Sequence, residues 1–298
     1  MPTREELNLN GIYEWETVKD KYKNPSLLLG NGFSMMFSQN FSYNSLFDIF
    51  LQNTNDQFRE LFSHFDTTNF ELIQKYLTYS LKVNSILGLP TEVIVQAIDE
   101  LKNGLIRTIE QVHPRCSEIN FTQLHYIAQQ LKDFGDIYTT NYDMYLYHII
   151  MLSNDIARVK KDYIAYQDWF WGRNNAPQGF LEFMTTQDYE YKHIFYLHGS
   201  LFIFNRGVLN IMLKRESANA ELINLIANQI RNDSFPVFIT EGSGAQKLEG
   251  INNNNYLYFC LKKLKSSSSP IMIFGNAMGE FDNHILDAIK ERPRDIIY

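Results

Sequence analysis

Cysteine is scarce in this chain, and its scarcity excludes two classes of protein. The only cysteines, Cys116 and Cys260, are too few for a disulfide framework and cannot supply a four-thiolate zinc site. We expect both to be buried as small apolar side chains. A chain of 298 residues with 45% hydrophobic residues can instead be stabilised by a substantial apolar core.

Long apolar runs are also missing from the sequence. The longest stretches, residues 149–152 and 270–274, are far shorter than the roughly 20 residues needed to span a bilayer. The N-terminal sequence MPTREELNLN carries charges of both signs and has no apolar core, unlike a signal peptide. These absences predict a cytoplasmic protein with no membrane segment.

Positive charge is in deficit, since the formal net charge is −7. Non-specific affinity for nucleic acid depends on lysine and arginine neutralising phosphates. We therefore expect no direct binding to nucleic acid.

Continuous apolar segments alternate with helical patterns over most of the chain. Short apolar runs bounded by glycine or proline are typical of strands buried on both faces. The runs that predict such strands are residues 25–29, 136–139, 193–197, 236–239 and 271–274. Because helical patterns separate them, the sequence predicts an α/β fold with a Rossmann-like, doubly wound, mainly parallel sheet. The aromatic-rich residues 169–175 are predicted to form a loop.

Residues 43–132 interrupt this alternation. Their apolar residues recur at spacings of three and four, as in Phe70, Ile73 and Leu77, which predicts an inserted helical subdomain. The whole chain 1–298 is expected to form one domain, with its core at about residues 25–42 and 133–298. Residues 295–298 resemble the start of another strand, so we expect the natural protein to continue beyond Tyr298.

Two glycine turns follow predicted strands. In the first, GNGFS at residues 30–34, backbone amides at the start of a helix could hold a phosphate, and glycine would allow close approach. The second is Gly275-Asn276. The third glycine of the dinucleotide fingerprint is missing from the first turn, so a tight turn or helix cap remains the alternative.

Polar side chains follow two further predicted strands. Asn141 offers both a donor and an acceptor, and can orient a carboxamide, a ribose hydroxyl or a water. Asp143 lies at the start of the next helix, where capping of that helix is the alternative to a role in binding. His198 precedes Gly199 and Ser200, which place its imidazole at the strand end as a candidate base; a buried core histidine is the alternative.

Other combinations of reactive residues give weaker signals. His193 and His198 lie five apart on a strand, so they face opposite sides of the sheet and cannot share a metal ion. The sequence therefore predicts no metal site. Neither Ser34, Ser200 nor Ser243 lies in a nucleophile elbow. Residues 241–245 are either another ligand loop or a flexible connection.

Taken in order, these motifs resemble the sirtuin-like domains, in particular the bacterial branch found in anti-phage defence systems. The resemblance covers about residues 25–40 and 135–298. It rests on the sequences GNGFS at 30–34, TNYD at 140–143, LHGS at 197–200, GN at 275–276 and DNHI at 282–285. The helical segment between the two parts is where such proteins vary.

The resemblance implies a Rossmann-like site for NAD. Asn141 would position a water and the nicotinamide ribose, and His198 would act as the general base on that ribose. The other positions implied to contact NAD are Gly30, Gly32 and Ser34 at the pyrophosphate, Asp143 at the nicotinamide end, Gly275 and Asn276 at the adenosine half, and in addition Asn31, Gly199 and Asp282.

The chain departs from protein deacylases of this family because it lacks their four-cysteine zinc module. The resemblance therefore implies an NAD glycohydrolase that uses NAD as its substrate, needs no metal, and acts as an abortive-infection effector. It also implies a homo-oligomer and a translocase-type ATPase as a partner. A sensor that binds NAD or ADP-ribose without turnover is the alternative, and an NAD-dependent protein deacylase ranks third.

Overall fold

A six-stranded parallel sheet forms the centre of the molecule. The computed structural model describes residue 9 and residues 13–41, 46–113, 118–161, 164–172, 178–185, 191–206, 211–215, 222–239 and 243–298. In the sheet the strands lie in the order β11-β10-β1-β2-β6-β3. Their bounds are β1 Ser26–Leu29, β2 Ile137–Thr139, β3 Tyr166–Gln167, β6 Lys192–Tyr196, β10 Ile271–Phe274 and β11 Ile296–Ile297.

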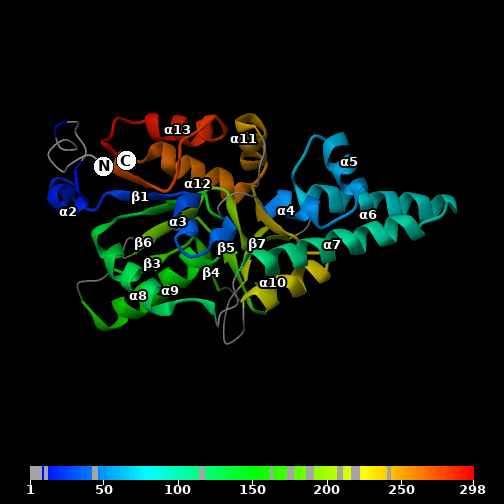
Figure 1. Cartoon of the computed structure of the whole chain (residues 1–298), viewed down its shortest axis with the longest axis horizontal. Helices are drawn as coiled ribbons and strands as arrows, with labels where there is room; N and C mark the ends of the chain where they lie inside the picture. Colours follow the sequence, from blue (N-terminus) through cyan, green and yellow to red (C-terminus); the bar gives the residue numbers. More distant parts are fainter. Residues whose placement is uncertain are drawn as a thin grey trace.

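Helices cover both faces of this sheet. On one face lie α8 (Phe121–Gln130) and α9 (Tyr145–Val159), and on the other lie α12 (Asn255–Ser266) and α13 (Asn283–Lys290) (Figure 1). All four residues of β1 are buried, as expected for a central strand covered on both sides. The predicted Rossmann-like, doubly wound fold is confirmed.

A second, antiparallel sheet adjoins the first and was not predicted. Its five strands lie in the order β4-β5-β8-β7-β9. Their bounds are β4 Phe170–Trp171, β5 Phe180–Phe183, β7 Gly199–Arg206, β8 Ile211–Arg215 and β9 Pro236–Phe238. The loop prediction was wrong for residues 170 and 171. The strand predicted at 236–239 exists, but it pairs antiparallel with β7 and does not join the parallel sheet.

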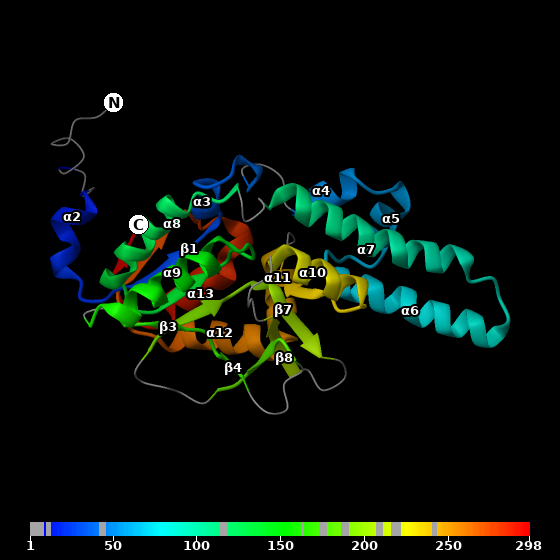
Figure 2. The same cartoon turned by 90° about the horizontal axis from the view of Figure 1, so that it is seen from below.

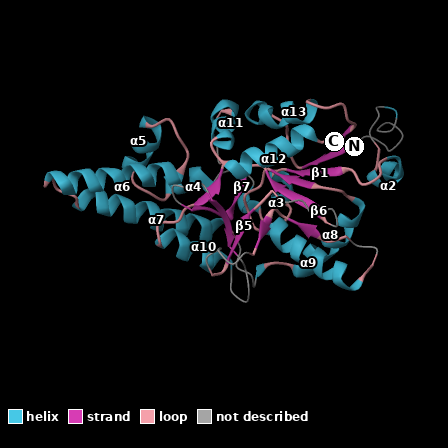
Figure 3. Cartoon of the chain, turned by 180° about the vertical axis from the view of Figure 1, so that it is seen from behind, coloured by secondary structure: helices cyan, strands magenta, loops and turns pink. Residues whose placement is uncertain are grey.

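The described residues between 46 and 130 form helices and connecting segments without strands. The helices are α4 (Leu46–Gln52), α5 (Asp56–His64), α6 (Phe70–Leu87), α7 (Glu92–Val112) and α8. Phe50, Phe58, Phe62 and Phe70 bury their rings in edge-to-face contacts that join α4, α5 and α6. The α6–α7 hairpin projects away from the sheets (Figure 3).

Shorter helices complete the chain. Their bounds are α2 Trp15–Val18, α3 Asn31–Met35, α10 Leu222–Arg231 and α11 Gly244–Asn252. Helix α10 packs between β7 and α7 and so connects the antiparallel sheet to the helical hairpin (Figure 2). Cys260 is buried, as predicted, whereas Cys116 lies outside the described residues. Within the described part of the chain, no helix combines the length and apolar character needed to cross a membrane.

Candidate functional site

Four parallel strands end side by side, and the predicted motifs follow them at one edge of the sheet. Leu29, at the end of β1, is in register with Phe274 of β10 and with Thr139 of β2. The hydrogen-bond ladder continues past the strand ends, with Gly30 N donating to Phe274 O at 2.9 Å and Leu197 N donating to Thr139 O at 2.8 Å. Ligands of open α/β sheets bind at this edge.

The two glycine turns pack directly against each other. Gly32 N donates to Gly275 O at 2.7 Å. A Cβ on Gly30 would lie 2.5 Å from the Asn276 Cβ, and a Cβ on Gly275, where φ is +71°, would lie 2.5 Å from Phe33 N. Close packing of the turns therefore accounts for these glycines, as the tight-turn alternative predicted. The helix that follows, α3, has only five residues.

Three polar side chains form a buried chain of hydrogen bonds beside the first turn. Asn141 Nδ2 donates to Gly30 O and to Ser34 Oγ, both at 2.9 Å. Ser34 Oγ in turn donates a hydrogen bond to Asp143 Oδ2. Asn141 is 8% exposed and Ser34 is fully buried. The tertiary fold thus joins Ser34 to Asn141 and Asp143, two predicted site residues that lie more than 100 positions further along the sequence.

Asp143 also caps the start of the next helix, which was the structural alternative to a role in binding. Its Oδ1 accepts the backbone N–H of Tyr145, the first residue of α9, at 2.9 Å. Burial raises the pKa of this carboxyl, while the hydrogen bonds from Ser34 and Tyr145 lower it. Asp143 therefore stabilises the start of α9 and also orients Ser34.

His198 lies in the short connection where the chain passes from the parallel to the antiparallel sheet. Its carbonyl accepts Ile239 N at 2.8 Å, just beyond β9. Gly199 has a φ of +74°, and a Cβ there would lie 2.1 Å from Val237 O. Ser200 Oγ donates to Tyr142 O at 2.9 Å. These contacts fix the backbone on both sides of His198.

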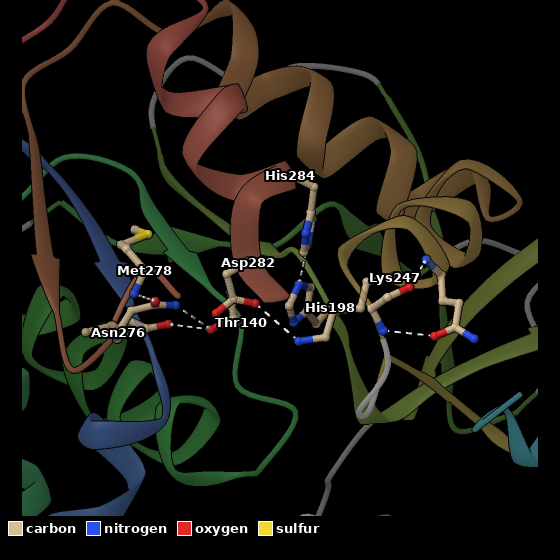
Figure 4. A network of polar contacts seen from close by, with 10 residues as sticks. Thr140, His198, Lys247, Asn276, Met278, Asp282 and His284 are labelled. Atoms are coloured by element: carbon tan, nitrogen blue, oxygen red, sulfur yellow. Dashed lines mark hydrogen bonds and ion pairs between the residues drawn. The ribbon is translucent and has the colours of Figure 1, made fainter. Parts of the chain in front are cut away.

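The imidazole of His198 meets residues from α13 and α11. His198 Nε2 lies 2.9 Å from His284 Nε2, and the two rings are nearly parallel, with an angle of 23° between them (Figure 4). Lys247 Nζ lies 3.2 Å from Asp282 Oδ1. One donor atom from each of His198, Asp282 and His284 falls within 4.8 Å of the others, so together these residues could hold a metal ion.

Both histidines favour the neutral form. Burial, followed by the neighbouring His284 and Lys247, holds the pKa of His198 well below its usual value, against a hydrogen bond to the Thr140 backbone that raises it. Burial lowers the pKa of His284 to about 4, although Asp282 opposes this shift. At neutral pH each ring therefore carries one proton and one free lone pair.

The side chains of two further predicted site residues form hydrogen bonds within the protein. Asn31 Nδ2 donates to Phe41 O at 2.7 Å, away from the strand ends. Asn276 Oδ1 accepts Met278 N at 2.7 Å, and its Nδ2 lies 3.5 Å from Thr140 Oγ1 (Figure 4). Asn276 therefore stays close to His198 through Thr140, whereas Asn31 supports the α3 region.

Two residues of the site were missed from the sequence. His284 belongs to the DNHI motif, but a histidine at the start of a predicted helix gives no sign that it faces another histidine. Lys247 lies inside α11, where a lysine is typical of an exposed helix face. Only the packing of α11 and α13 on the strand ends brings these residues to His198.

A family model now places the chain among known sequences. Residues 27–294 match the model of a domain of unknown function, DUF4917. The chain belongs to the DUF4917 family. No curated protein matches it. The DUF4917 match runs from β1 through α13, so it includes both the Asn141–Ser34–Asp143 chain and the His198–Asp282–His284 cluster.

Proposed function

We propose that this DUF4917 protein is a sirtuin-like NAD glycohydrolase. The observation that carries the proposal is that Asn141 and His198 follow the adjacent parallel strands β2 and β6 at the ligand-binding edge of a Rossmann-like sheet. His198 forms a hydrogen bond to the backbone of Thr140, the residue before Asn141. The choice of NAD as the substrate rests on the order of the motifs, which resembles that of sirtuin-like domains.

The chemistry requires a base and an oriented water. The bond from the ribose C1′ to the nicotinamide nitrogen breaks through an oxocarbenium-like transition state, and a bond from C1′ to the water oxygen forms. Neutral His198 accepts a proton at the ribose, and the Asn141 amide orients the water and the ribose. The products are nicotinamide, ADP-ribose and one proton.

The described arrangement is closed around both residues. His198 is 4% exposed, and the Asn141 amide nitrogen is engaged by Gly30 and Ser34. Binding of a dinucleotide therefore requires these groups to rearrange. A site of this kind suits an abortive-infection effector, since hydrolysis of cellular NAD must be restrained until an oligomer or a translocase-type ATPase partner activates it.

Nicotinamide release from NAD by the purified protein tests the proposal. We expect His198→Ala and Asn141→Ala each to lower the rate by about 100-fold or more, as for loss of a general base or an orienting group. His193→Ala is the matched control, because His193 lies in β6, the strand that precedes His198, but its ring stacks on Trp169. Circular dichroism of each variant separates loss of chemistry from loss of fold.

The buried state of His198 also favours a second function, a sensor that binds NAD or ADP-ribose without turnover. Calorimetric binding of NAD that persists in His198→Ala, with no nicotinamide released by any assembly, would select the sensor. Protein deacylation ranks last, and only nicotinamide release that depends on an acyl-lysine peptide would support it.

A further inference from the structure

Two buried histidines face each other at the edge of the candidate site. His198 follows β6 and His284 is the second residue of α13, and their Nε2 atoms are 2.9 Å apart (Figure 4). His198 is 4% exposed and His284 is 5% exposed. At this distance the two Nε2 atoms form a hydrogen bond, so one of them donates a proton and the other accepts it.

One ring nitrogen of this histidine pair has no hydrogen-bond partner among the described residues. His198 also forms a hydrogen bond to the Thr140 backbone, which fits a donating Nδ1–H; its Nε2 then carries the lone pair that faces His284. His284 must supply the proton between the rings, which leaves its Nδ1 as an acceptor. That Nδ1 is buried and has no hydrogen-bond partner among the described residues. An unpartnered buried nitrogen has a free-energy cost, so the pair is not a fully satisfied structural contact.

A carboxylate completes a set of metal ligands. Asp282 lies two residues before His284, and a single donor atom from each of Asp282, His198 and His284 falls within 4.8 Å of the others. Two imidazoles and one carboxylate are a common protein ligand set for zinc and similar ions. Ligand atoms around tetrahedral zinc are roughly 3.4 Å apart, from bond lengths near 2.1 Å, so to bind the ion the two Nε2 atoms, now 2.9 Å apart, separate slightly and the carboxylate moves inward.

The outer contacts suit a metal site at His198. A ligating histidine usually donates its second N–H to a carbonyl or carboxylate, which fixes the ring and its tautomer. The hydrogen bond from His198 to Thr140 provides this contact. Lys247 acts in the opposite direction, because its ammonium pairs with Asp282 at 3.2 Å and its charge repels a cation.

We propose that His198, His284 and Asp282 form a binding site for a divalent transition metal of the zinc class. Metal binding replaces the hydrogen bond between the rings, and the Nε2 proton of His284 moves to its Nδ1. The metal then takes the Nε2 lone pair of His198 that would accept a proton, so the occupied site cannot hydrolyse NAD. This regulatory consequence rests on the proposed function; the metal site itself does not. Lys247 weakens the site, so that the metal binds reversibly.

Cobalt titration of the full chain, stripped with EDTA and dialysed, tests the site directly. We expect one Co²⁺ per chain with visible absorption bands, displaced by Zn²⁺. His284→Gln and Asp282→Asn should each weaken binding by more than about tenfold, since even outer-shell changes cost roughly 10- to 100-fold. His125→Gln is the control for adventitious surface binding, because His125 is an exposed histidine of α8. Thermal unfolding checks that each variant folds.

The Lys247→Met variant gives a result that a misfolded site cannot give. Removing the ammonium frees Asp282, so this variant should bind Co²⁺ more tightly than wild type. Absence of bound metal in the wild type, or equal binding by wild type, His284→Gln and Asp282→Asn, would overturn the proposed site.

Nicotinamide release with and without Zn²⁺ then tests regulation. If the metal regulates the enzyme, the rate of nicotinamide release should fall in proportion to the occupancy of the metal site, as determined by the cobalt titration. Full activity at full occupancy would refute this regulation. If no assembly hydrolyses NAD while stoichiometric cobalt binding persists, the glycohydrolase proposal fails and the metal site stands.

Discussion

Gly199 shows how a single backbone position holds the candidate base in place. Its positive φ and the 2.1 Å approach of Val237 O to a Cβ leave no room for any side chain. We predict that Gly199→Ala lowers the free energy of unfolding by about 3 kcal/mol or more, because the strained backbone and the displaced β9 both contribute. Urea unfolding followed by circular dichroism measures this change.

Gly279→Ala is the matched control for that substitution. A Cβ on Gly279 meets nothing within 4 Å, and its φ is −72°. We expect a change within about 0.5 kcal/mol, as for an open surface position. Similar losses of unfolding free energy in both variants would mean that the close approach of Val237 O does not restrict which residue fits at position 199.

His113 predicts a dependence of stability on pH. Burial lowers its pKa from 6.5 to about 4, which corresponds to about 3 kcal/mol. Because the unfolded chain binds this proton more readily, the contribution is complete above pH 6.5 and is lost as the pH falls toward 4. We expect His113→Phe to lose less unfolding free energy than wild type between pH 7 and pH 4.5 in urea titrations.

The exposed His125 provides the comparison for His113. His125→Phe removes a histidine whose only described hydrogen bond is to Gln129, at 3.1 Å on the surface of α8. The unfolding free energy of His125→Phe should depend on pH as that of the wild type does. If His113→Phe keeps the full acid sensitivity of wild type, other histidines whose pKa is lowered by burial, such as the partly buried His148 and the buried His198, must cause it.

At the scale of elements, α11 positions Lys247 against Asp282. Ser243 and Gln246 form a reciprocal capping box at its start, with Ser243 Oγ accepting Gln246 N and Gln246 Oε1 accepting Ser243 N. We predict that Ser243→Ala costs about 1 kcal/mol of stability. Chemical denaturation measures the change, and Ser268→Ala at an exposed turn should have almost no effect. No difference between the two variants would show that the cap is dispensable.

The elements also show why a strand can be predicted without its partner. The apolar run at 236–239 identified β9, but its position beside β7 depends on Gly199, which lies far away in sequence. The sequence of a short strand does not specify its neighbour or whether the pairing is parallel or antiparallel, because both edges of the strand can form hydrogen bonds. The antiparallel sheet is therefore a tertiary result.

At the scale of the whole molecule, the closed site predicts that activity depends on assembly. If the chain is a glycohydrolase, the isolated subunit should release nicotinamide much more slowly per chain than the oligomer or the complex with its partner. Specific activity measured over a range of chain concentrations, with light scattering to follow mass, tests this. Full activity of the monomer would contradict it.

The sequence by itself determined the class of the fold and the motifs that follow the parallel strands. Buried apolar strands that alternate with helices can form few other architectures, and strand ends are marked by local glycine and polar residues, as at Gly30, Asn141 and His198. Only the tertiary structure decided which side chains meet. His284, Asp282 and Lys247 reach His198 because two helices pack on the strand ends, and contacts between residues far apart in sequence depend on packing, which local patterns do not encode.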